Sequence, residues 1–394
     1  MYRYPANRDR SRPCYKSASG TLFAALLIGL VVAIGVPLWA QTPPKPTFEE
    51  IEKRAAEARE AKQFEEAVTL YREGIKLKPS WKEGTWYLGT SLYGLQRYAE
   101  ARDAFRHLAL SQSSNAQAWA LAGMCEFELK NYARALEFLS RSESAGVGEN
   151  KELAYLVHFR IALLLNRAGE PRQALDRLMV IAAEGTYPEV IEAMGLSLLR
   201  TPLLPSEIPD QDRDLYTRAG EAMNAYVAHD TESATRLFDE LVATYPNKPN
   251  VHFARGAFLM EIAPDKALQE FQREIELNPS NANALLQIAK LYIKQGAPEK
   301  ALPYARRAVK EDQNIPAAHR ILGESLLGTG ETAAAIQELG TAVRLEPEFP
   351  QTHFLLAQAY QRAGKKALAD KEMTEFQRLD KKQKSEFSKA NTQK

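Results

Sequence analysis

Small apolar residues recur along this chain at a nearly constant spacing. The series consists of nine alanines, and a second alanine or glycine stands eleven or twelve residues before each of them. The first three alanines are 34 residues apart, and the last four are again 34 apart. The nine alanines are Ala67, Ala101, Ala135, Ala174, Ala234, Ala267, Ala301, Ala335 and Ala369. Because a unit of this length cannot bury its apolar face alone, the period predicts repeated units stacked on one another.

Within each unit the apolar residues follow helical spacing. Leu88 and Leu92 precede a turn near Gln96, and Ala101 and Phe105 follow it. Two amphipathic segments separated by a short turn are typical of a helical hairpin. Each unit is therefore predicted to be a pair of helices that approach closely at their small residues.

The repeat register divides the chain into segments. About four repeats are predicted over 48–188 and about five over 215–383, followed by a polar tail over 384–394. The break at 189–214 is predicted to hold one unpaired helix and then a loop, because Pro202, Pro205 and Pro209 interrupt it. Two interpretations of this break stay open: a hinge between two arrays, or a loop that binds a partner.

The first forty residues have the pattern of a segment that directs export. Basic residues precede an uncharged stretch from Ser17 to Pro44, and Leu22 to Val36 is apolar throughout. This order is typical of a signal peptide, although the uncharged span is also long enough for a membrane anchor of ~20 residues. Residues 1–40 are predicted to be one or the other, with a proline-rich tether over 41–47. In both cases we expect the repeats to be exported, either periplasmic or anchored to the inner membrane.

Charge and chemistry exclude several classes of function. The formal net charge is +1, so nothing predicts a nucleic-acid partner. No nucleotide-binding, nucleophile or metalloprotease motif is present, and no cofactor, metal site or catalytic residue is predicted. The periodic histidines are interpreted as packing residues, because copies one repeat apart cannot share a metal; they are His158, His252, His319 and His353. Cys125, in a first helix, is likewise interpreted as a packing residue.

Several units resemble the tetratricopeptide repeat. The unit beginning at 116 has Trp119, Ala122, Gly123 and Ala135 at the positions where that family has its large and small residues. The resemblance implies an all-α fold, a solenoid of stacked helical hairpins wound as a right-handed superhelix. The chain is similar to exported bacterial proteins of this family.

The same resemblance implies that the first helices line a concave groove. The groove positions carry apolar, aromatic and methionine side chains, which suit a peptide or protein segment. The candidate groove residues are Trp86, Tyr93, Met124, Phe127, Phe253, Met260, Leu286, Ile293, Leu327 and Phe354. Packing between neighbouring helices is the competing interpretation. The polar groove positions are mixed in charge, with Lys290, Lys294, Arg320, Arg362 and Glu324 among them.

The sequence therefore predicts a noncatalytic scaffold that binds protein or peptide partners, in envelope assembly or secretion. A purely structural accessory subunit of a membrane complex is the alternative, and membrane contact is expected only through an uncleaved amino-terminal segment. A remote third hypothesis is an enzyme with its site in the 201–214 loop, where the carboxylates are Glu207, Asp210, Asp212 and Asp214.

Overall fold

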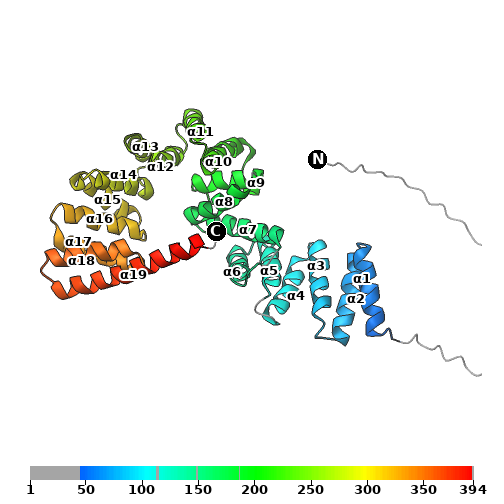
Figure 1. The fold of residues 1–394 in the computed structure, drawn as a ribbon. Coiled ribbons are helices and arrows are strands. Elements are labelled where there is room, and N and C mark those ends of the chain that lie inside the picture. Colours follow the sequence, from blue (N-terminus) through cyan, green and yellow to red (C-terminus); the bar gives the residue numbers. More distant parts are fainter. Residues whose placement is uncertain (1–44, 112–114, 148–149, 186, 393–394) are drawn as a thin grey trace, which may run out of the picture. The chain divides into compact units, whose positions relative to one another are not determined.

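A computed structural model describes residues 45–111, 115–147, 150–185 and 187–392, and these residues are almost entirely helical (Figure 1). The first eight helices are α1 (Phe48–Glu60), α2 (Phe64–Leu77), α3 (Lys82–Gly94), α4 (Tyr98–Ser111), α5 (Ala116–Glu128), α6 (Tyr132–Ser144), α7 (Lys151–Arg167) and α8 (Pro171–Glu184). The middle of the chain holds α9 (Pro188–Leu198), two short 3-10 helices (Pro205–Glu207 and Asp210–Asp212), α10 (Arg213–Val227), α11 (Thr231–Thr244) and α12 (Val251–Leu259). The remaining helices are α13 (Pro264–Leu277), α14 (Ala282–Lys294), α15 (Pro298–Glu311), α16 (Pro316–Gly328), α17 (Thr332–Leu345), α18 (Pro350–Arg362) and α19 (Lys366–Thr392). The predicted all-α solenoid of stacked hairpins is confirmed.

The recurring alanines lie where the two helices of a hairpin meet. Eight of the nine are 0% exposed and Ala369 is 9% exposed. Glycines serve the same contact from the other helix: a Cβ added to Gly89 would lie 2.7 Å from the Phe105 ring. A small residue on one helix therefore makes room for a large ring on the other.

Helix α9 is not unpaired, so the prediction of an unpaired helix within 189–214 is wrong. It packs against both α8 and α10. The contact with α10 is a close backbone approach, because a Cβ on Gly195 would overlap the carbonyl oxygen of Tyr216 and a Cβ on Gly220 that of Ile191. The two glycines allow α9 to pair with a helix that follows a long loop instead of a short turn.

The loop between α9 and α10 is held against the repeats. Leu204 and Ile208 are buried, at 5% and 4% exposed. The buried Asn166 of α7 donates its side-chain Nδ2 hydrogen to the carbonyl of Thr201, at 2.7 Å. The apolar residues between the prolines therefore belong to the core.

One hydrophobic core runs through the predicted break. The same cluster of buried residues contains Leu163 of α7, Leu204 of the loop and Phe238 of α11. The helices on either side of 189–214 thus share a core instead of ending two separate ones.

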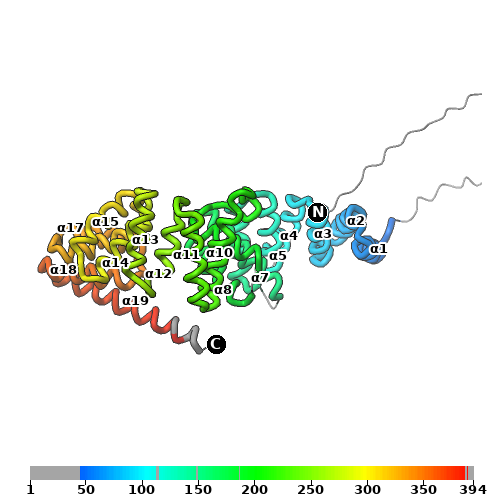
Figure 2. Tube along the Cα trace, turned by 90° about the horizontal axis from the view of Figure 1, so that it is seen from above, coloured from blue at the N-terminus to red at the C-terminus, as the bar shows by residue number. Residues whose placement is uncertain are grey.

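The two ends of the chain differ in what the structure describes. The last helix, α19, continues to Thr392, and Figure 2 shows it extending beyond the helices it packs on. The predicted signal or anchor segment, 1–40, lies outside the described residues. Among the helices described, none is long and apolar enough to span a bilayer.

Candidate functional site

Four of the ten candidate groove residues are buried. Met124, Phe253, Leu286 and Leu327 are 4–6% exposed. The first helices that carry Met124, Leu286 and Leu327 contact the first helix of a neighbouring hairpin: α5 contacts α7, and α14 contacts α16. Phe253 of α12 is buried in a cluster with residues of α13 and α14, such as Phe271 and Ile288. The expectation that all ten line a groove therefore does not hold for these four, which are packing residues.

The other six are half-buried and rest on partners. Trp86 packs edge-on against Phe105, with ring centroids 5.6 Å apart, and Phe354 lies 5.3 Å from Phe376. Met260 and Ile293 pack at the margins of two core clusters. The remaining two, Tyr93 and Phe127, have partly exposed rings, and both belong to a larger cluster of aromatic and arginine side chains.

Tyr93 and Phe127 belong to a cluster of aromatic and arginine side chains. Both pack against the same core of α5 to α7, and each makes an edge contact with a tyrosine of the following helix, Tyr98 or Tyr132. The guanidinium of Arg160 lies 4.1 Å from the Phe127 ring centroid, and that of Arg167 lies 4.4 Å from Tyr132. We call these six half-buried side chains the aromatic patch: Tyr93, Tyr98, Phe127, Tyr132, Arg160 and Arg167. Tyrosine and arginine are, with tryptophan, the side chains enriched at the energetic centres of protein interfaces.

Three of the periodic histidines form the same buried contact. In each, Nδ1 faces a glutamate of the following helix and Nε2 faces a backbone carbonyl of the preceding turn. The sets are His252 with Glu270 and Pro246, His319 with Glu338 and Gln313, and His353 with Glu372 and Pro347. The glutamate hydrogen bond raises the pKa of His252 above its usual value, against the lowering by burial. These histidines tie each hairpin to the turn before it.

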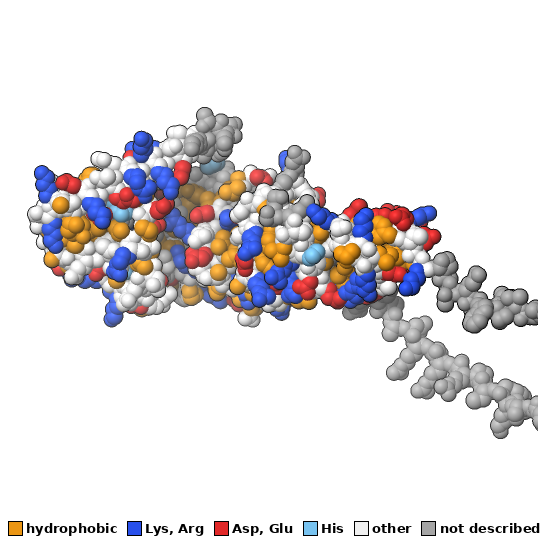
Figure 3. All heavy atoms as spheres, turned by 90° about the horizontal axis from the view of Figure 1, so that it is seen from below, with side chains coloured by type: hydrophobic (Ala, Val, Ile, Leu, Met, Phe, Trp, Pro, Cys, Tyr) orange, Lys and Arg blue, Asp and Glu red, His pale blue; other side chains and the backbone are white. Residues whose placement is uncertain are grey.

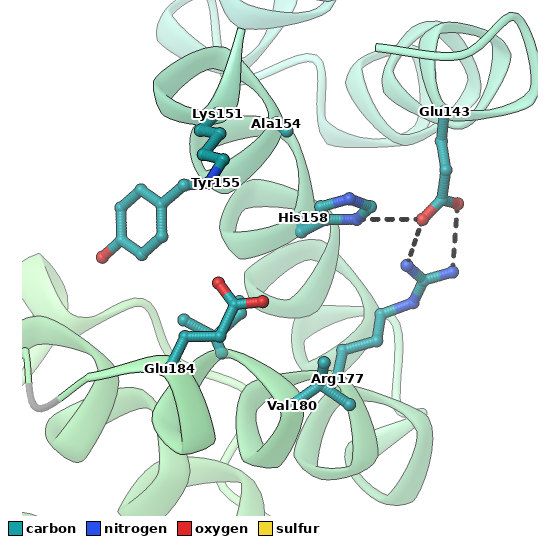
Figure 4. A pocket seen from close by; sticks show the side chains of 9 residues that line it. Glu143, Lys151, Ala154, Tyr155, His158, Arg177, Val180 and Glu184 are labelled. Atoms are coloured by element: carbon teal, nitrogen blue, oxygen red, sulfur yellow. Dashed lines mark hydrogen bonds and ion pairs between the residues drawn. The ribbon is translucent and has the colours of Figure 1, made fainter. Parts of the chain in front are cut away.

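His158 departs from this pattern. Its side chain is 40% exposed, and its Nδ1 lies 3.0 Å from Glu143, which belongs to the preceding hairpin. Arg177 stands where the other repeats have the glutamate, and it donates two hydrogen bonds to Glu143 (Figure 4). The Arg177 hydrogen bonds hold the pKa of Glu143 below its usual range.

A cavity of about 750 Å³ opens beside His158, between α6, α7 and α8. Apolar side chains line it (Ala154, Val180 and Ile181), together with side chains of both charges. Figure 4 shows the Glu184 carboxylate pointing from α8 toward α7, whereas the His158 ring points toward Glu143 of α6. This cavity was not predicted from the sequence. The signal for it was the slip from 34 to 39 residues between Ala135 and Ala174.

Of the groups considered for chemistry, Cys125 is buried and three of the four loop carboxylates are ion-paired. Burial raises the pKa of the Cys125 thiol to about 12, so it stays protonated near neutral pH. In the 201–214 loop, Glu207 pairs with Arg167, Asp212 with Lys248 and Asp214 with Arg218. Across the described ranges, no three His, Cys, Asp or Glu side chains are grouped so that they could hold a metal ion.

Comparisons with known proteins agree with this architecture. Family models described as tetratricopeptide repeat match residues 53–109, 87–149, 258–324 and 321–369. The chain is 24% identical over 268 residues to the human protein O-mannosyl-transferase TMTC3, covering 61% of this chain and 27% of that protein. The chain thus spans about a quarter of the length of this curated relative.

Solved structures of low sequence identity were also found. MamA from residue 41 onward, from Desulfovibrio magneticus RS-1, is 20% identical with a TM-score of 0.40, over 43% of this chain and 96% of that chain. YrrB, described as a TPR protein with an unusual peptide-binding site, is 16% identical with a TM-score of 0.37, over 41% of this chain and 84% of that chain.

Proposed function

Because the chain belongs to the tetratricopeptide repeat family, we propose that it is a noncatalytic scaffold that binds protein segments. The observation that carries this proposal is the aromatic patch, where partly exposed rings are fixed by edge contacts and covered by guanidinium groups. Fixed aromatic side chains lose little conformational entropy on binding, and they supply large contact areas. A protein segment lying across α3, α5 and α7 would contact Tyr93, Phe127 and Arg160 together.

Serine substitutions in the patch test this proposal. We expect Tyr93→Ser and Phe127→Ser to reduce the recovery of crosslinked protein partners from native membranes, measured by quantitative mass spectrometry. The matched controls are Leu77→Ser and Leu110→Ser, which alter side chains 57% and 61% exposed on α2 and α4. Unchanged recovery with the patch variants, while their circular dichroism melts remain cooperative, would contradict the proposal.

The alternative is an accessory subunit that acts only by holding a larger membrane complex together. On that hypothesis the patch variants recover their partners normally, and the exposed-leucine variants on the second helices lose them. The same crosslinking experiment therefore separates the two functions.

The proposal also includes where in the cell the scaffold acts. The basic and then apolar order of residues 1–40 supports export, with the repeats in the periplasm or tethered to the inner membrane, where the scaffold would serve envelope assembly or secretion. A reporter active only after export, fused behind Lys394, is expected to be active. A silent fusion that is expressed at normal level would contradict export.

A further inference from the structure

Two tyrosine rings lie together where α7 begins and α8 ends. Tyr155 of α7 lines the cavity described above, and the ring centroid of Tyr187, which immediately precedes α9, lies 5.0 Å from its own. Tyr155 is also stacked on Phe159 and donates its hydroxyl hydrogen to Glu189, at 3.1 Å. These contacts hold the pair of rings in place, while Tyr187 stays 38% exposed.

A carboxylate without a counter-charge stands next to this pair. Tyr187 packs against Gly185, because a Cβ added there would lie 3.3 Å from its ring. Glu184, the residue before Gly185, lines the same cavity as Tyr155, and Figure 4 shows both of them on the side away from Arg177. Among the described residues, no Lys, Arg or His nitrogen lies within 4.0 Å of the Glu184 carboxylate.

Glu184 also occupies a place in its helix where negative charge is unfavourable. It is the last residue of α8, and the last turn of that helix holds no basic residue. The carbonyl groups at the carboxyl end of a helix carry partial negative charge, which favours a cation there. Glu143, in the last turn of α6, has such a cation, because Arg177 donates two hydrogen bonds to it. At the end of α8, a cation from another molecule would fill the same role.

The rest of the chain shows which cation suits such rings. Among the described residues, six of the seven cations placed over an aromatic ring are arginines, and none lies over Tyr155 or Tyr187. The planar guanidinium group can stack on a ring and pair with a carboxylate at the same time. Acidic and basic side chains are interspersed over the face shown in Figure 3, so recognition of a cation depends on local contacts of this kind.

We propose that Tyr187 and Glu184 bind an arginine side chain of a protein partner. This inference rests on the proposed protein-binding function and adds a contact outside the aromatic patch and outside the ten candidate groove residues. The guanidinium stacks on the exposed face of the Tyr187 ring and pairs with the Glu184 carboxylate, and the aliphatic stem packs on Val180, which is 66% exposed. Lys151 lines the same cavity, and its positive charge opposes the guanidinium.

A labelled peptide of alternating glycine and arginine tests this site by fluorescence anisotropy. The same peptide with citrulline in place of arginine is the neutral probe, and a third peptide carries lysine. We expect the full chain to bind the arginine peptide, to bind the lysine peptide more weakly because an ammonium group does not stack, and to bind the citrulline peptide weakest of all.

Variants assign the binding to this place on the surface. Glu184→Gln and Tyr187→Leu should each weaken binding of the arginine peptide by about fivefold, whereas Lys151→Met should tighten it by about twofold. Glu311→Gln is the matched control, because Glu311 is the exposed last residue of α15, as Glu184 is of α8. This control should leave binding unchanged.

The opposite signs of these effects separate a binding role from a structural one. All three altered side chains are exposed, so the variants should melt cooperatively by circular dichroism, and a loss of packing would not tighten binding in Lys151→Met. Absence of binding, equal affinity for the citrulline or lysine peptide, or unchanged affinity in Glu184→Gln would overturn the proposal. Weaker binding by Lys151→Met would also contradict it.

Two further outcomes define what fails. Displacement of the peptide by an equimolar amount of free arginine would assign the site to the free amino acid and overturn the proposal of a protein segment. If the arginine peptide does not bind while Tyr93→Ser and Phe127→Ser still lose crosslinked partners, only this inference fails and the protein-binding function stands.

Discussion

At the residue scale, the fold depends on small side chains opposite large rings. Phe105 is 0% exposed and fills the space beside Gly89. Deleting its ring leaves a cavity that the neighbouring helices cannot fill, because their small residues already set the closest approach. We expect Phe105→Ala to lower the free energy of unfolding by ~3–5 kcal/mol, measured by urea denaturation. Leu110→Ala, on the exposed side of the same helix, should cost far less; similar losses in both would contradict this account.

The histidine contacts make stability depend on pH. The raised pKa of His252 means that the folded state binds its proton more tightly than the unfolded state, whose value is near 6.5. This contribution is therefore fully present below about pH 6.5 and is lost as pH rises through the folded pKa. We expect the stability difference between wild type and His252→Gln to shrink as pH rises from 6 upward, by urea denaturation at each pH. A difference independent of pH would rule out the charged pair with Glu270.

At the element scale, the pairing of α9 with α10 depends on two glycines. A Cβ at Gly195 meets backbone of α10, which cannot move aside, whereas a Cβ at Gly89 meets only the edge of the Phe105 ring. We expect Gly195→Ala to lower the melting temperature more than Gly89→Ala does, since overpacking a ring costs ~1–3 kcal/mol. Equal shifts in the two melts would show that α9 and α10 can separate without loss.

The helices themselves were predictable, but the partner of α9 was not. Met194 and Gly195 stand in register with the small residues of the other first helices, so the sequence indicates a helix with a close contact. The partner follows a loop containing three prolines, and local periodicity carries no information on what lies beyond such a loop. The close approach is visible only once Gly195 and Gly220 face each other.

At the scale of the whole molecule, the proline loop joins the two halves through a shared core. Leu204 and Ile208 are buried, and Asn166 binds the Thr201 carbonyl. Cleavage by a protease requires local opening, which would expose these groups. We expect limited proteolysis of the folded chain to spare residues 199–212, as read by mass spectrometry of the first fragments. A first cut within this loop would favour the hinge interpretation instead.

Lys290 of α14 adds a second pH dependence, of opposite sign. With the pKa of folded Lys290 at about 8 and an ordinary lysine value of 10.5, the unfolded state holds the proton over this interval and the folded state releases it. Stability therefore rises as pH increases from about 8, because the unfolded state binds more protons. We expect this rise between pH 8 and ~9.5 in urea denaturation of the wild type, but not of Lys290→Met. The same rise in both proteins would mean that burial in the fold does not disfavour the charged form of Lys290.

The candidate site was only partly predictable. Tyr93 and Phe127 were identified from their repeat positions, and they do belong to the aromatic patch. Arg160 and Arg167 were missed, because their stacking depends on how α7 lies against α5 and α6. Met124 and Leu286 were expected to line a groove but are buried, since the contact between successive first helices sets their exposure.

The sequence by itself determined the repeat, the hairpins and the small residues at their contacts, because helix periodicity and close packing act over a few turns of chain. Tertiary structure alone decided the partner of α9 and the continuous core through 189–214. Those features depend on the rotations between neighbouring hairpins, which accumulate along the stack. A small change in each rotation changes which distant side chains meet.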